Sequence, residues 1–265
     1  MAPEFEDLAV QLAGRRSAAE VRALWQRLAQ PRGERPPFDP AELRHLPEPA
    51  RRWLQHALVP GTPLYQAVAL RMHGHIRIGR WLPFQAIQLH APPNGYLWAA
   101  KAGFGPIGIR GYDSYADGTG RMRWRLFGLL PLIDSVGPDI DRSAAGRVAL
   151  DAFTLPTSWL RPGVSWQSGG GEGAALAHWQ VGNWALEVRL SVGPDGALRT
   201  LAMPRWAAPR GEPWGEYSCG GTLAGERSFT GVRIPTELRA GYFFRTPRWP
   251  EGEFFRATVT DAAFW

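Results

Sequence analysis

From residue 67 onward, apolar and polar side chains alternate with a period of two, the repeat of a half-buried β-strand. Residues 68–78 show this most clearly, with one apolar face and one face of arginine and histidine. A sheet with one buried face and one solvent-exposed face is typically antiparallel. The same pattern predicts further strands at 84–91, 95–102, 107–116, 163–167, 174–181, 184–192, 197–204, 214–223, 226–230, 233–243 and 253–261.

Tight turns join several of these strands, as at Asp117-Gly118 and Asp195-Gly196. After the first turn, Met122, Trp124 and Leu126 alternate with arginines. Together the patterns predict roughly ten or more antiparallel strands, and a sheet of that size curls. We therefore predict a mainly β fold with helices (α+β): a large curved antiparallel sheet or half-open β-barrel.

Residues 129–160 interrupt the strands, and their second part is rich in alanine and glycine. Small residues permit a helix to approach a sheet closely, so we predict a helical insertion on the concave side. Asp141 or Ser143 is expected to cap this helix. Arg147 and Asp151 have the spacing of an exposed i,i+4 ion pair.

The N-terminal part has helical periodicity over residues 4–30, with Ser17 as an expected N-cap and Glu20 completing a capping box. Its mixed charges favour packing on the main domain or on a partner chain, and the second arrangement would give a homo-oligomer through these helices. Proline-led short helices are expected after the linker. The predicted division is an N-terminal helical extension and linker at 1–37, and a half-barrel domain at 38–265.

Composition excludes several classes of protein. The net charge is +6, but no run of five like charges occurs, which favours a dispersed basic surface and no nucleic-acid partner. The single cysteine, Cys219, excludes an internal disulfide and a cysteine-based zinc site. No stretch of about 18 apolar residues and no signal-peptide core occur, so we expect no integral membrane segment and a cytoplasmic location.

The usual catalytic and cofactor motifs are missing. Gly103–Gly108 matches GxGxxG, but a strand pattern follows where a phosphate loop needs a helix. His73 and His75 share a strand face at ligand-like spacing, and His90 is expected on a neighbouring strand. The arginines beside this pair repel a cation, so we predict no metal, no cofactor and no catalytic residue.

Two groups of residues point instead to a ligand. Tryptophans on the predicted sheet are typical of core, yet they also suit the wall of an apolar cavity. Two segments, 203–206 and 245–249, pair arginine with tryptophan and are expected as loops near one rim, where arginine meets an anionic head group. The candidate ligand-binding residues are Trp98, Met122, Trp124, Asp141, Arg142, Arg205, Trp206, Arg245 and Trp249.

Several distinctive segments are spread over roughly residues 45–265. They are Leu46-Pro-Glu-Pro-Ala-Arg-Arg-Trp-Leu54, Trp81-Leu-Pro-Phe84, Arg110-Gly-Tyr-Asp-Ser-Tyr115, Gly137-Pro-Asp-Ile-Asp-Arg-Ser-Ala-Ala-Gly-Arg147, Met203-Pro-Arg-Trp206, Ile234-Pro-Thr-Glu-Leu-Arg-Ala-Gly241 and Glu251-Gly-Glu-Phe-Phe-Arg-Ala-Thr-Val-Thr-Asp261. Together they resemble an uncharacterised bacterial domain-of-unknown-function family (DUF6920/DUF6544-like). The resemblance implies membership and no activity. A more distant architectural likeness is to the lipoprotein-carrier (LolA/LolB-like) half-barrel, which holds acyl chains.

Three functions follow as hypotheses. The first is binding of a hydrophobic or amphipathic small molecule, such as a lipid or acyl chain, in the half-barrel. The second is an enzyme acting on a small apolar substrate through Asp139, Asp141 and Arg142, which requires a carboxylate facing a pocket. The third is a structural or partner-binding module.

Overall fold

The computed structural model describes residues 3–105 and 107–265; Pro106, in the glycine-rich segment, lies outside them. The helices are α1 (Pro3–Ala13), η1 (Arg15–Ser17), α2 (Ala18–Ala29), η2 (Pro40–Leu43), α3 (Glu48–Ala57), α4 (Pro138–Asp151), η3 (Ala152–Thr154), η4 (Pro156–Leu160), η5 (Pro209–Gly211) and α5 (Trp249–Gly252), where η marks a 3₁₀ helix. The strands are β1 (Val68–Ile78), β2 (Arg80–Ala91), β3 (Gly95–Phe104), β4 (Ile107–Ala116), β5 (Thr119–Leu126), β6 (Leu130–Ser135), β7 (Val164–Ser168), β8 (Ala174–Val181), β9 (Trp184–Val192), β10 (Leu198–Ala207), β11 (Gly215–Phe229), β12 (Val232–Tyr242) and β13 (Glu253–Phe264).

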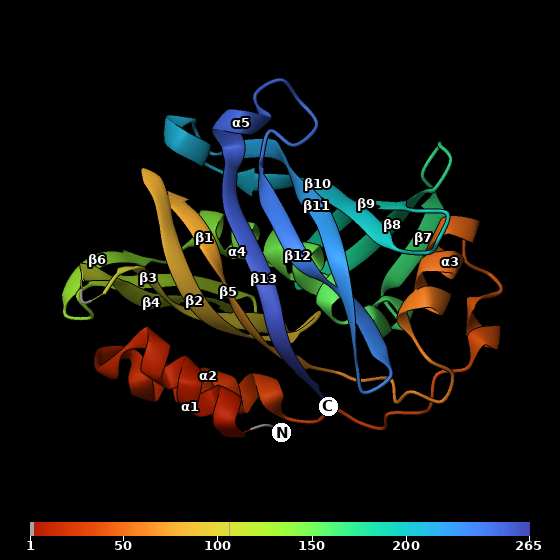
Figure 1. The fold of residues 1–265 in the computed structure, drawn as a ribbon, viewed down its shortest axis with the longest axis horizontal. Helices are drawn as coiled ribbons and strands as arrows, with labels where there is room; N and C mark the ends of the chain where they lie inside the picture. Colours follow the sequence, from red (N-terminus) through yellow and green to blue (C-terminus); the bar gives the residue numbers. More distant parts are fainter. Residues whose placement is uncertain (1–2, 106) are drawn as a thin grey trace.

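Over the described residues these strands form one antiparallel sheet of 13 members, which confirms the predicted curved, half-open form (Figure 1). Two meanders, β1–β6 and β7–β13, meet where β1 pairs with β13. The free edges are β6 and β7, and the chain between them runs through the concave side as α4, η3 and η4. The insertion therefore lies where both wings of the sheet curl around it.

Each face of the sheet has its own core. On the outer face, α1 and α2 pack against β1–β4, burying Trp25, Leu89 and Leu97. On the concave face, α4 lies between the two wings and α3 covers the end formed by β8, β9 and β12 (Figure 1). There Trp159 contacts the rings of Trp53, Trp166 and Trp179 at centroid separations of 4.9–5.4 Å. The apolar face of α1 and α2 is thus buried against the sheet of the same chain.

The insertion differs from the prediction in its first part. Residues 130–135 are not helical but form β6, which pairs with β5 at the sheet edge. The helix then starts at Pro138, before the expected cap, because Pro138 occupies the first turn and Gly137 precedes it with φ 117°. Neither Asp141 nor Ser143 is therefore its N-cap.

Two other local features differ from the predictions, because contacts distant in the sequence decide them. The predicted strands at 214–223 and 226–230 are one continuous strand, β11. The Ser17 hydroxyl at the start of α2 is buried without a hydrogen-bond partner, so the capping box does not form. Glu20 instead pairs with Arg121 and Arg123 on β5, because α2 packs on β2–β4 and β5 is the next strand of the sheet. The division at residue 37/38 stays a prediction.

Candidate functional site

Helix α4 approaches the concave face closely because its buried side chains are small: Ala144, Ala145, Gly146, Val148 and Ala149. A Cβ at Gly120 of β5 would lie 2.7 Å from the carbonyl oxygen of Ile140. A Cβ at Gly146 would lie 3.2 Å from Cγ of Arg205 on β10. The backbone of the helix thus lies against the backbone of β5 in one wing and against the Arg205 side chain of β10 in the other.

A charged cluster lies between α4 and the sheet. Arg147 donates from Nη1 to Asp113 and from Nε to Asp151, both at 3.1 Å. Its guanidinium also lies over the rings of Tyr96 and Trp98, 4.7 and 5.2 Å from their centroids. The i,i+4 pair with Asp151 therefore forms as predicted, but it is half-buried and belongs to a larger network. We call Asp113, Arg147, Asp151 and Arg205 the concave charge cluster.

Burial perturbs the acid-base behaviour of this cluster. It raises the pKa of the Asp113 carboxyl, although Arg147 and the Trp124 indole favour the charged form. Burial disfavours the Arg147 cation, yet Asp151, Tyr96 and Asp113 outweigh it and raise the pKa of Arg147. The group is therefore a mutually stabilised set of charges in a site of restricted solvation.

Arg205 is the unusual member of the cluster. Its Nε donates to the Ser143 carbonyl at 3.1 Å and its Nη2 to the Ser143 hydroxyl at 3.4 Å. Across residues 3–105 and 107–265 it forms no ion pair with a carboxylate. Its neighbours include Tyr242 and the thiol of Cys219, whose pKa is raised by burial despite the arginine. This cation therefore has spare capacity for an anion.

The start of α4 forms a second polar group next to the first. Arg142 lies 4.2 Å from the ring centroid of Trp206 and 5.3 Å from that of Trp184, and it also pairs with Glu216. The Trp206 indole donates to Asp139 at 2.7 Å. The arginine-tryptophan stacking expected at this rim does occur, but Arg142 of α4 supplies the arginine.

The two acids of α4 have structural partners. Asp139 accepts from Trp206, and Asp141 accepts from the backbone N–H of Gly120 at 2.7 Å. Both contacts fasten the first turn of α4 to a wing of the sheet. This geometry offers no carboxylate pair directed at a common reacting atom.

Aromatic rings line the concave face beside the cluster. Trp98 contacts Phe84, Trp124 and Phe255 at centroid separations of 5.7–6.1 Å. Trp98 and Trp124 are only 2% and 5% exposed, and Met122 is half-buried against the same core. These predicted wall residues thus come together, with α4 filling the space above them.

The remaining two predicted residues lie elsewhere. Segment 203–206 is part of β10, and segment 245–249 is a loop only up to Arg248, because α5 begins at Trp249, so the two are not paired rim loops. Arg245 donates to Thr200 on the outer surface at 3.0 Å, and Trp249 packs on Phe244. The structure therefore does not bring this pair into the group around Arg142.

Neither Asp113 nor Tyr96 was predicted as a site residue, and the buried His90 was considered only as a ligand of a metal site that the flanking arginines disfavour. Each lies on the apolar face of a strand whose inward positions are otherwise mostly hydrophobic. A charged or polar residue at an inward-facing position of a predicted strand is the signal by which they could have been recognised. His90 faces inward while His73 and His75 face outward, so the three do not share a face.

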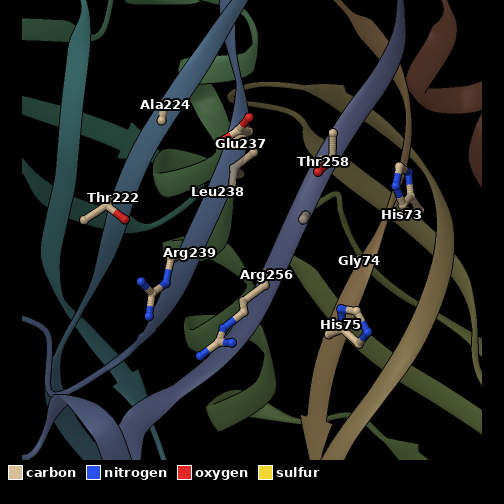
Figure 2. Close-up of a pocket in the computed structure, with 11 residues that line it drawn as sticks. His73, Gly74, His75, Thr222, Ala224, Glu237, Leu238, Arg239, Arg256 and Thr258 are labelled. Carbon is tan, nitrogen blue, oxygen red and sulfur yellow. The ribbon is translucent and has the colours of Figure 1, made fainter.

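A shallow outer pocket of about 350 Å³ crosses β1, β13, β12 and β11. Figure 2 shows Arg239 and Arg256 there, with His73 and His75 on the neighbouring strand. Glu253 accepts hydrogen bonds from both arginines. These bonds, that from Arg256 most of all, lower the pKa of the Glu253 carboxyl to about 2. Within the described residues no group of three metal-ligating side chains gathers. Both cations of the pocket thus share the single carboxylate of Glu253.

The family of this chain follows from its sequence profile. The profile of a family of unknown function, DUF6544, matches residues 36–254. The chain belongs to this family. No curated protein sequence matches the chain.

One solved structure resembles it in overall fold. It is a crystal structure from Vibrio parahaemolyticus, described as a proposed outer membrane lipoprotein-sorting protein domain, with 5% identity and a TM-score of 0.42. The alignment covers 75% of this DUF6544 chain and 85% of that chain. In the described part of the chain no helix has the length and apolarity needed to cross a membrane.

Proposed function

We propose that this DUF6544 protein binds an amphipathic molecule with an apolar chain and an anionic head, such as a lipid or fatty acid, on its concave face. The observation that carries the proposal is Arg205, a cation on the concave side that, among the described residues, hydrogen-bonds to Ser143 and pairs with no carboxylate. Placing a guanidinium away from water without a carboxylate is costly, and an anionic ligand would remove that cost.

Helix α4 is the element that would move to admit the ligand. Its contact with the sheet rests on small side chains, so displacing it exposes less apolar area than displacing a leucine-rich helix would. Its other contacts are ion pairs and hydrogen bonds, and buried ion pairs contribute little net stability. The role predicts that amide hydrogen exchange is faster in α4 than in β1 and β13, and equal exchange rates would contradict it.

The ligand's two parts would meet different surfaces. The apolar chain would lie on the rings of Trp98, Trp124 and their neighbours, which α4 now covers. The anionic head would sit between Arg205 and Arg142, because these are the two cations at the start of α4. Aromatic walls with a few convergent polar groups are typical of small-molecule sites.

The experiment is native mass spectrometry of gently purified protein, followed by titration with a fluorescent fatty acid. We expect a bound lipid-like mass in the first and saturable binding in the second. Arg205→Gln should weaken binding by about tenfold, the loss of one charge-assisted hydrogen bond. Arg199→Gln is the matched control, since Arg199 lies on the same strand but pairs with Asp195 on the surface.

Binding that is absent in the wild type would refute the proposal. Equal binding by the Arg205 variant and the wild type would also refute it. The enzyme hypothesis gains no support from Asp139 and Asp141, since each already holds a structural partner. A cytoplasmic location and a homo-oligomer stay predictions.

A further inference from the structure

Large apolar side chains are exposed at one corner of the sheet. They lie at the β3–β4 and β5–β6 hairpin ends and along the edge strand β6, at the left in Figure 1. Their exposure is between 49% and 68%. Outside these two hairpin ends and β6, the described residues expose large apolar side chains only singly, at Val59, Ile78, Val136 and Trp214. We call this the tip patch: Phe104, Ile107, Phe127, Leu129, Leu130 and Leu132.

A row of cations lies just behind the tip patch. In the strand register Lys101 of β3 faces Arg110 of β4, and Arg110 faces Arg125 of β5. Like charges directly opposite one another across strands are destabilising. In the part of the chain that the structure describes, none of the three forms an ion pair; Arg110 donates only to the Gln11 carbonyl.

Two further arginines extend this row. Gly14 lies beside Arg110, since a Cβ there would be 3.8 Å from the Arg110 side chain. Directly after Gly14, η1 carries Arg15 and Arg16, both exposed. The sequence disperses these charges, and the fold gathers them on one side of the tip patch.

From this arrangement we infer that the tip patch and its cation row dock on the surface of an anionic lipid bilayer. Lys101 and Arg110 each lie three residues from the nearest tip residue, about 10 Å along a strand. Apolar groups of interfacial proteins sit about 5–10 Å deep with basic groups at the phosphates. The tips would enter the acyl boundary while lipid phosphates neutralise the mutually repelling cations.

A second copy of the chain suits this surface less well. Edge strands recruit partners through free backbone N–H groups, and Pro131 removes one from β6. The register between β5 and β6 also shifts between Trp124 and Arg125, and such an irregularity makes the edge a poorer template for pairing with another strand. Repelling cations on two copies would be brought together, whereas a bilayer supplies the opposite charge.

The test is co-sedimentation of the full chain with lipid vesicles. We expect binding to phosphatidylcholine vesicles that contain about 30% phosphatidylglycerol, little binding to phosphatidylcholine alone, and weakening by salt. Leu129→Gln with Leu130→Gln should reduce binding by about tenfold or more. Val59→Gln, with the same 59% exposure as Leu129 but far along the chain from the tips, is the matched control.

The cation row has its own variant. Lys101→Gln with Arg125→Gln should weaken binding by about fivefold for each charge removed. Arg35→Gln with Arg44→Gln removes two exposed arginines elsewhere as control. Near-ultraviolet circular dichroism and thermal unfolding check that each variant stays folded.

Three results would overturn the inference. They are no binding of the wild type to anionic vesicles, wild-type binding by both the tip and the cation variants, and a wild-type dimer that the leucine variant dissociates without any vesicle binding. The inference goes beyond the proposed ligand. A chain that docks but carries no fatty acid, or the reverse, separates the two.

Discussion

His90 makes the stability of the protein dependent on pH. The side chain is fully buried on the concave face, where Nε2 donates to the Val148 carbonyl at 3.1 Å and Nδ1 lies 3.2 Å from the Thr154 hydroxyl. It thus joins β2 to the last turn of α4 and to η3. Burial is the main cause that lowers its pKa from 6.5 to about 4.

The magnitude follows from that shift. Between pH 6.5 and about 4, the unfolded chain takes up a proton at His90 that the folded protein does not. The free energy of unfolding therefore falls as the pH falls through this window. A difference of about 2.5 pH units corresponds to about 3 kcal/mol, present above pH 6.5 and lost near pH 4.

Urea unfolding at half-unit pH steps measures this effect. His90→Asn removes the titrating group, so the wild-type minus variant free energy should fall by about 3 kcal/mol between pH 6.5 and 4. All other titrating groups are common to both proteins and cancel. Parallel curves would refute the reasoning. If the variant fails to fold, an NMR titration of wild-type His90 with a midpoint near 6.5 would refute it equally.

Three further predictions test the packing. Arg147→Met leaves Asp113 half-buried without its cation and should lower the free energy of unfolding in urea by about 3–5 kcal/mol, of which an added Asp113→Asn recovers part; unchanged stability would contradict the network. Trp159→Ala should cost about 3–5 kcal/mol by thermal unfolding, since it empties the centre of four tryptophan rings; a loss below about 1 kcal/mol would mean that the site repacks. Deleting residues 1–37 uncovers the apolar outer face of β1–β4, so light scattering should show aggregation, and a folded monomer would contradict this.

Much of the fold could be predicted because its signals are local. A period of two depends only on which neighbours are apolar, so β1–β5 and β7–β13 could be placed from the chain. Strand β6 was not predicted, because its residues Leu130–Ser135 lie at an edge of the sheet and are exposed on both faces. Without one buried face the alternation disappears, and only pairing with β5 makes the segment a strand.

The sequence predicted which types of residue form the candidate site, but not all of the individual residues. Trp98, Trp124, Arg142 and Trp206 were recognised from residue type alone, and the fold brings them beside α4. Asp113 was missed since its partner Arg147 lies 34 residues away on another element. Arg245 was included because its motif matched, although the loop carries it to the outer surface.

Side-chain period and size were enough to predict the antiparallel sheet, the helices before it and the small-residue helix in the insertion. Long-range contacts were needed to establish that β1 pairs with β13, that α4 fills the concave face, and that Lys101, Arg110 and Arg125 become neighbours. Register and closure arise from long-range pairing, which no local pattern encodes.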